Sequence, residues 1–172
     1  MVEMNKEKFK NAVLYFAQNA GDVGWSTVGK KKLAKLFYFL DFTVYELKQK
    51  SVSNIVYKKE NFGPMPLFYQ SLIELKKQAI IDIKKPDKNW LGLERIVAKQ
   101  EPDLNVFDEN EKLYLKQISE KYRSASAAEL ERIAKSEPPY KMVKYGEEIP
   151  YYLAFYRNTF GEMDLNDKNT DS

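Results

Sequence analysis

The reactive side chains that this sequence lacks limit its chemistry more than those it has. Its 172 residues include no cysteine and no histidine, which excludes disulfides, thiolate metal sites and the common Ser-His and Cys-His nucleophiles. Acid–base chemistry would have to rest on carboxylates, lysines, tyrosines and serines. The sequence shows no glycine-rich phosphate loop, no cluster of metal ligands and no nucleophile beside a base. We therefore expect a protein that is not an enzyme and uses no metal or cofactor.

Asp41 is the carboxylate with the most unusual neighbours in the sequence. At 100° per residue it lies about 80° from the apolar stripe of its predicted helix, near the ring-bearing positions Phe37 and Tyr38. A carboxylate there is costly unless it is hydrogen-bonded. We interpret it first as a buried acceptor for a tyrosine hydroxyl or for the backbone near Gly63-Pro64. The alternatives are an anchor in an interface and a catalytic carboxylate.

Lysines are concentrated in the first part of the chain. Residues 1–100 carry 18 basic and 10 acidic side chains, whereas residues 101–172 carry 10 and 15. Such polarity lets two halves dock on each other or presents one charged face to a partner. Lys30-Lys31-Lys32 begins a helix, where the three side chains fan over about 200°. The run is interpreted as a solvated helix start, with a clamp for phosphate or for an acidic partner as the alternative.

The elements that must position these residues alternate between helices and short strands. Residues 5–19 predict an amphipathic helix, which Gly21-Asp22-Val23-Gly24 ends. Ser26-Thr27 is expected to cap a helix over residues 27–49 that is apolar nearly all round and therefore buried. Next come a strand (54–60), a turn (61–66) and a helix from Pro66 to Gln78. Strands at 80–84 and 93–99 follow, joined by a polar loop.

The second part of the sequence predicts further helices. One begins at Asp108 with Leu113, Leu115 and Ile118 facing inward, and another is capped by Ser126 and stopped by Glu137-Pro138-Pro139. A short helix is expected over residues 140–145, and an aromatic run ends with the pairs Tyr151–Phe155, Tyr152–Tyr156 and Tyr156–Phe160.

These elements predict an α+β fold that is predominantly α-helical. About six helices surround the buried 27–49 helix, and strands 54–60, 80–84 and 93–99 form one small antiparallel sheet. We expect one domain over residues 1–163 and a disordered tail over 164–172. The first residues have no apolar signal sequence and no segment is long and apolar enough to span a membrane, so a cytoplasmic location is expected.

Three stretches of the chain resemble the Panacea domain, a family of phage- and prophage-associated proteins that includes antitoxins. They are Lys35-Leu36-Phe37-Tyr38-Phe39-Leu40-Asp41-Phe42, then Phe62-Gly63-Pro64-Met65-Pro66, and last the segment from Phe107-Asp108 to Glu137-Pro138-Pro139-Tyr140-Lys141. Their order and spacing cover roughly residues 30 to 145. The family often has His at the position of Lys135 and Trp at that of Tyr140, so roles tied to those side chains do not transfer.

The resemblance implies an antitoxin that neutralises a protein toxin encoded beside it by direct binding. It also implies phage defence as a setting, and some relatives resemble adaptors that carry a bound toxin to a protease. Self-association is a further expectation. Since Met and aromatic residues are enriched at interface centres, we predict the partner-binding residues Phe62, Met65, Tyr140, Tyr145, Tyr151 and Tyr152. The motif residues expected to be structural are Lys35, Asp41, Gly63, Pro64, Glu137 and Pro138.

The alternative function is a winged-helix transcriptional regulator that binds DNA. The order helix, helix, strand, helix, strand, strand over residues 5–99 is that of a winged helix, and Lys84, Lys85 and Lys88 would lie at the wing. The predicted recognition helix offers Gln70, Ser71, Glu74 and Lys77 outward but no Arg, the commonest reader of guanine. The sequence supports DNA binding less strongly than it supports the antitoxin.

Overall fold

The computed structural model describes residues 3–21, 26–85 and 94–157. The helices in these ranges are α1 (Lys6–Asn19), α2 (Lys30–Lys48), α3 (Tyr69–Lys77), α4 (Glu109–Tyr122), α5 (Ala127–Ser136) and α6 (Pro138–Lys141), with the 3-10 helices η1 (Leu104–Val106) and η2 (Tyr151–Tyr156). The strands are β1 (Thr27–Gly29), β2 (Tyr57–Glu60), β3 (Gly63–Pro66), β4 (Ile81–Lys84) and β5 (Arg95–Ala98). The predicted α+β class, predominantly helical, is confirmed.

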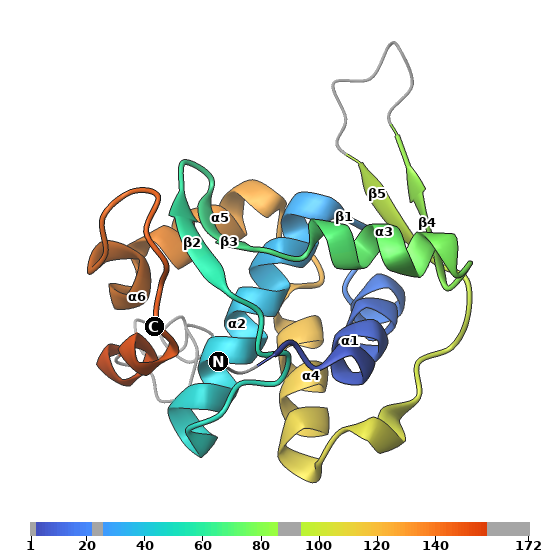
Figure 1. Cartoon of the computed structure of the whole chain (residues 1–172), viewed down its shortest axis with the longest axis horizontal. Helices are drawn as coiled ribbons and strands as arrows, with labels where there is room; N and C mark the ends of the chain where they lie inside the picture. The colour runs from blue at the N-terminus through green and yellow to red at the C-terminus, as the bar shows by residue number, and fades with distance from the viewer. Residues whose placement is uncertain (1–2, 22–25, 86–93, 158–172) are drawn as a thin grey trace, which may run out of the picture.

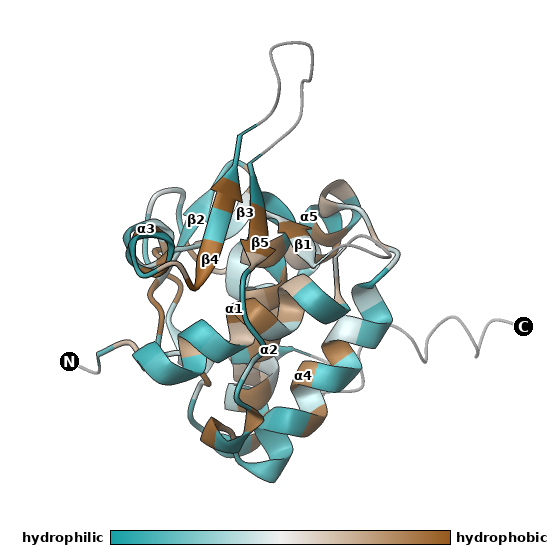
Figure 2. Cartoon of the chain, turned by 90° about the vertical axis from the view of Figure 1, so that its right-hand side faces the viewer, coloured by the Kyte–Doolittle hydropathy of each residue, from teal (hydrophilic) through white to brown (hydrophobic). Residues whose placement is uncertain are grey.

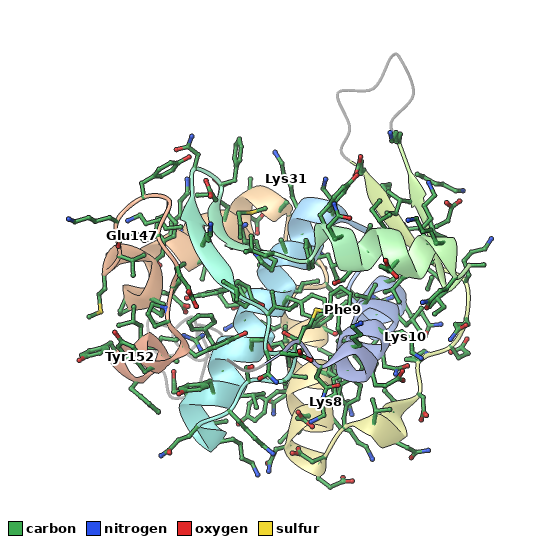
Figure 3. The ribbon with its side chains drawn as sticks, viewed as in Figure 1. Lys8, Phe9, Lys10, Lys31, Glu147 and Tyr152 are labelled. Atoms are coloured by element: carbon green, nitrogen blue, oxygen red, sulfur yellow. The ribbon has the colours of Figure 1, made fainter. Side chains whose placement is uncertain are left out.

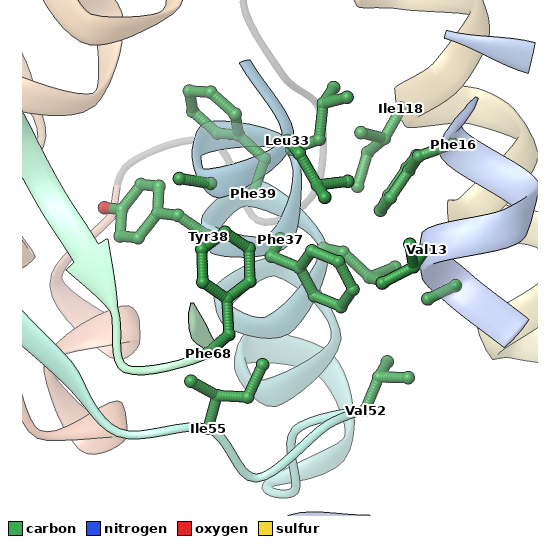
Figure 4. Packing of buried hydrophobic residues seen from close by; sticks show 14 of the residues in the cluster. Val13, Phe16, Leu33, Phe37, Tyr38, Phe39, Val52, Ile55, Phe68 and Ile118 are labelled. Atoms are coloured by element: carbon green, nitrogen blue, oxygen red, sulfur yellow. The ribbon is translucent and has the colours of Figure 1, made fainter. Parts of the chain in front are cut away.

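Helix α2 is the centre of the molecule. It packs against α4, α5, β3 and η2, so every side of it is covered (Figure 1). The ring of Phe37 lies 5.5 Å from that of Phe16 and 6.0 Å from that of Phe68, both edge-on (Figure 4). An apolar helix stabilises a domain only when its whole surface leaves water. The prediction of a buried central helix is therefore confirmed, while its start differs from the expected one.

The cap expected at Ser26-Thr27 is wrong because these residues begin a strand. Thr27–Gly29 pairs with β5, and α2 starts only at Lys30 with Gly29 as an N-cap that offers no side-chain hydrogen bond. Helix α1 matches its prediction, and its N-cap Asn5 accepts a hydrogen bond from Lys8 N. Residues 22–25, which include most of the predicted break after α1, lie outside the described residues.

The strands form two sheets where one was predicted. β1, β5 and β4 pair antiparallel in that order, while β2 pairs with β3. Strand β3 occupies the segment expected to be a turn, and Pro66 ends it instead of starting a helix. The prolines are compatible with this strand because of its register. Leu67 N donates a hydrogen bond to Val56 O, and in an antiparallel pair every second residue points its nitrogen toward the partner strand. The nitrogens of Pro64 and Pro66 therefore point away from β2, where no N–H donor is needed.

The first half of the chain has the topology of a winged helix with one insertion. The chain runs α1, β1, α2, α3, β4, β5, and the sheet order β1-β5-β4 is that of a winged-helix sheet. The hairpin β2–β3 is inserted between α2 and α3. In Figure 1 this hairpin and the hairpin β4–β5 both project upward, with the start of α2 between them. The predicted winged-helix-like first half is confirmed, but its first strand is β1 and not the expected strand 54–60, which pairs with β3 in the other sheet.

The C-terminal helices form the other side of the core. Asp108 and Glu111 make a capping box at α4. As predicted, Ser126 caps α5, and α5 ends at Ser136 before the two prolines. The short helix expected over residues 140–145 is α6, which starts earlier because Pro138 suits a first helical position. Leu113 is not inward: its side chain is 45% exposed. It lies 200° from Leu115 on the helical wheel, on the opposite face. In Figure 2 the apolar stripes of α1, α2 and α4 face one another.

No described helix is long and apolar enough to cross a membrane.

Candidate protein-binding surface

Asp41 is a buried hydrogen-bond acceptor. Its carboxylate receives the backbone N–H groups of Val52 at 2.9 Å and Ser53 at 2.8 Å. It also receives the hydroxyls of Ser53 at 2.5 Å and Tyr57 at 2.7 Å. Burial raises the pKa of Asp41 to about 6, even though these hydrogen bonds act to lower it. The residue ties the segment after α2 back onto the helix. The tyrosine was anticipated, but the backbone donors come from residues 52–53 and not from Gly63-Pro64.

Lys35 fastens the β2–β3 hairpin to α2. Its side chain is buried and its Nζ donates to Pro64 O at 3.2 Å and contacts Met65 Sδ at 3.3 Å. Gly63 leaves room for it: the backbone there has φ +102°, and an added Cβ would come within 3.0 Å of Lys35 Cε. Burial lowers the pKa of Lys35 to about 8, with Glu131 acting in the opposite direction.

Glu137 belongs to a buried ionic network that holds the C-terminal segment. Its carboxylate receives two hydrogen bonds from Arg157, Nε at 3.1 Å and Nη2 at 3.2 Å, and one from Tyr38 OH at 2.8 Å. Arg157 also donates to Thr43 Oγ1 at 3.0 Å and lies 3.6 Å from Glu46. Although burial acts to lower it, the pKa of Arg157 is raised by Glu137, Tyr38 and Glu46. Because Arg157 directly follows η2 and Thr43 and Glu46 belong to α2, the network holds η2 against α2.

Among the predicted partner-binding residues, three are at the surface. Phe62, Tyr145 and Tyr152 have 53%, 57% and 58% of their surface exposed. Phe62 is at the tip of the β2–β3 hairpin, with Lys31 Nζ 4.2 Å from its ring centre. In Figure 3 the side chain of Tyr152 points outward from η2.

The other three predicted partner-binding residues are half-buried or largely buried. Met65 contacts Lys35, and Tyr140 OH donates to Glu60 O at 2.7 Å. The ring of Tyr151 stacks on that of Tyr45 at 5.4 Å, and its hydroxyl donates to Ile55 O. These side chains therefore hold the fold together more than they face a partner, and Pro138 starts α6 as its first residue.

Three exposed apolar residues of the C-terminal segment were not among those selected from the sequence. They are Met142, Phe155 and Tyr156, and each is at least half exposed. Together with Tyr145 and Tyr152 they are the exposed side chains that we term the C-terminal aromatic surface, carried by η2 and by residues 142–145 after α6. Helices α6 and η2 pack against each other. The run of rings at residues 151–156 was visible in the sequence. The expected α-helical pairs Tyr151–Phe155 and Tyr152–Tyr156 fall in a 3-10 helix, which turns different rings outward. Phe160, the partner expected for Tyr156, lies outside the described residues.

A surface groove of about 580 Å³ begins beside this surface. Its apolar lining includes Tyr45, Val52, Ile55, Val56 and Tyr152, and charged groups from Lys8, Lys50 and Glu148 stand around it. Concave sites with apolar walls and a few polar groups are typical binding sites for ligands, and such a site can hold a side chain that protrudes from a partner.

The predicted DNA-contacting lysines are only partly described. Lys84 ends β4 and Lys85 follows it, both exposed, whereas Lys88 lies outside the described residues. Within the ranges that the structure covers, no group of three Asp or Glu residues is placed to hold a metal ion.

Comparison with known proteins agrees with the arrangement of the motif residues. The profile of the family described as antitoxin SocA-like, Panacea domain, matches residues 33–141. The match begins in α2 and ends with α6, so it covers Lys35, Asp41, Gly63, Pro64, Glu137 and Pro138. No curated protein and no solved structure matches the chain. Since the profile covers well over half of the sequence, the chain belongs to the antitoxin SocA-like, Panacea domain family.

Proposed function

We propose that this protein is an antitoxin that neutralises a cognate protein toxin by binding it directly, in the cytoplasm and without chemistry of its own. The observation that carries the proposal is the C-terminal aromatic surface on a member of an antitoxin family. Five large apolar side chains are exposed between residues 142 and 156, and a concentration of exposed apolar side chains is typical of an interaction site. Family membership points to a toxin as the partner.

The composition of this surface suits tight protein binding. Tyr, Phe and Met are enriched at interface centres, and a tyrosine covers a large area while losing few rotamers. The backbone beneath is already fixed by Arg157 and Tyr151. Association therefore costs little additional ordering entropy at η2.

The groove beside Tyr152 gives the partner a place to insert a side chain or a short segment. Lys50 and Lys8 are at one part of its wall and Glu148 is at another. Phe62 at the hairpin tip, supported by Met65, would provide a second contact. Tyr140 and Tyr151 would act indirectly, by supporting the exposed rings.

The test is co-expression with the product of the neighbouring gene. We expect growth arrest when the neighbour is expressed alone, relief when this chain is present, and a stable complex on co-purification. A harmless neighbour that does not co-purify would overturn the proposal.

Paired variants locate the contact. Tyr152→Ala with Tyr156→Ala is expected to lower toxin affinity at least about tenfold and to abolish the relief of growth arrest, since each ring is a candidate hot spot. Leu104→Ala with Leu113→Ala is the matched control, because these residues are also exposed and apolar but lie on η1 and α4. Equal neutralisation by both folded variants would show that the toxin binds elsewhere.

A further inference from the structure

The winged-helix half presents a second surface, separate from the C-terminal aromatic one. In helix-turn-helix proteins the second helix lies in the major groove while the first helix meets the backbone. By position in the chain, α3 corresponds to that second helix and α2 to the first, with the β4–β5 hairpin as the wing. The inserted hairpin β2–β3 projects to the same side of the molecule as the wing (Figure 1).

Helix α3 has one buried and one free face. Leu72 and Leu75 are buried against the domain. Gln70, Glu74 and Lys77 follow one another at helical spacing on the exposed side, and the helix is mostly hydrophilic in Figure 2. A nine-residue helix with a polar outer face is of a size that a DNA major groove admits.

Cations surround this face on several elements. Lys76 and Lys77 end α3, Lys84 ends β4 and Lys85 follows it. All four side chains are exposed. None of them forms an ion pair with a carboxylate of the described residues. The acidic residues nearby are partly engaged: Glu94 pairs with Lys30 at 3.1 Å, and Asp82 accepts the N–H of Ile83. Glu74 is the acidic group on α3 itself.

The lysine run at the start of α2 lies at the same end of the molecule. Lys31 is between the two hairpins in Figure 3, and Lys30 Nζ is 4.7 Å from the ring centre of Tyr69, the first residue of α3. A helix start normally favours acidic side chains. Lysines at this position match the backbone-facing end of the first helix of a helix-turn-helix, where a phosphate would meet them.

We infer that α3, the start of α2 and the outer end of β4, at Lys84 and Lys85, form a surface that binds double-stranded DNA. An acidic protein would also be attracted by the lysines, but the strand order and the polar outer face of α3 favour a duplex. Because α3 carries no Arg, contacts with phosphates dominate, and binding has little preference for base sequence.

The experiment is a salt titration of duplex binding by fluorescence anisotropy with the full chain. The probes are one short duplex of random sequence and one with the sequence upstream of the gene itself. Wild-type protein is expected to bind both, with the logarithm of affinity falling linearly as the logarithm of salt concentration rises. Absence of salt-dependent binding to either duplex would overturn the inference.

Two charge-matched variants test the location. Replacing Lys76, Lys77, Lys84 and Lys85 by Gln should weaken binding at least about tenfold and reduce the salt slope by about 3. Replacing Lys48, Lys50, Lys112 and Lys116 by Gln removes the same charge from α2's other end and from α4, and should change the slope by less than about 1. Equal losses in the two variants would show attraction by net charge alone and would contradict the assigned surface.

Toxin neutralisation separates this inference from the proposed function. The first variant should still relieve growth arrest, because the C-terminal aromatic surface is untouched. If the same variant lost both activities while remaining folded by circular dichroism, a single surface would serve both partners and the division proposed here would be wrong. If the chain binds DNA but does not relieve the growth arrest, the antitoxin proposal is wrong and the DNA-binding inference stands.

Discussion

The motif residues and the C-terminal aromatic surface differ in almost every physical respect. Lys35, Asp41 and Glu137 are shielded from water and satisfied by hydrogen bonds within the chain. Tyr152 and Tyr156 expose more than half of their surface. The first group lies inside the matched range 33–141, whereas all five residues of the second follow it.

This difference separates residues that hold the scaffold together from residues exposed on it. The buried polar residues fix the segment after α2, the β2–β3 hairpin and the C-terminal segment onto one helix. A buried charge with a complete set of partners specifies one packing arrangement and tolerates few replacements. The exposed rings make fewer contacts within the chain, so replacing them should disturb the scaffold less. The predictions below test that division, beginning with the largest effect.

Glu137→Ala should cause the largest loss of stability. It leaves the guanidinium of Arg157 buried without its bidentate partner and removes the acceptor of Tyr38 OH. Breaking one side of a buried ion pair typically costs about 3–5 kcal/mol. Urea denaturation monitored by circular dichroism gives the change in the free energy of unfolding. Glu147→Ala, an exposed glutamate, is the control and should shift it by less than about 0.5 kcal/mol. Similar shifts in both variants would refute the structural role of Glu137.

Much of the scaffold could be predicted from the sequence. The nearly unbroken apolar surface of residues 33–44 predicts a buried helix, and the capping residues Asp108 and Ser126 predict where α4 and α5 begin. These features are local, so one sequence suffices to detect them. The hydrogen-bonded environment of Asp41 was also predictable in kind, because a carboxylate among rings must be satisfied.

Long-range pairing was harder to predict. Prolines at 64 and 66 argue against a strand unless their nitrogens face away from the partner, and that depends on the register with β2. Arg157 and Glu46 were missed as a pair, since 111 positions separate two charges that meet only after folding. The sequence identified the region that carries the C-terminal aromatic surface. It did not show which rings face outward, because that depends on the 3-10 geometry of η2.

Asp41→Ala is the next test, with an expected loss of about 3 kcal/mol in the free energy of unfolding. The change leaves the buried N–H groups of Val52 and Ser53 without their acceptor, and each such group costs on the order of 1–3 kcal/mol. The hydroxyls of Ser53 and Tyr57 lose an acceptor too, but a hydroxyl can rotate toward another partner. Asp41→Asn keeps one carbonyl oxygen and should cost about half as much. Denaturant unfolding measures both. If Asn were as damaging as Ala, the charge and not the hydrogen-bond count would be decisive.

The buried Lys35 should make the stability of the protein depend on pH in alkaline solution. Its pKa is about 8 in the fold and 10.5 ordinarily, so the folded protein releases this proton first. The free energy of unfolding should therefore rise by roughly 1 kcal/mol between pH 7 and pH 9. Burial raises the pKa of Tyr38, Tyr57 and Tyr151 above their ordinary 10.0, so their opposing effect begins only as the pH approaches 10, where the unfolded chain starts to lose these protons. Thermal or urea unfolding across this range should show the rise in wild type and not in Lys35→Met. A rise that survives the substitution would assign it to another group.

The smallest effect comes from two neighbouring tyrosines that belong to different regions. Tyr151→Phe removes a buried hydroxyl that donates to Ile55 O, and should cost about 1 kcal/mol of stability. Tyr152→Phe alters an exposed ring and should change stability by less than about 0.5 kcal/mol. Urea denaturation of the two variants measures this difference, and calorimetric titration with the toxin supplies the second readout. Tyr151→Phe should retain its affinity if its ring only supports the surface, whereas Tyr152→Ala should lose it with little loss of stability. If stability and affinity fell together in both positions, the separation between scaffold and contact surface would not hold even for adjacent residues.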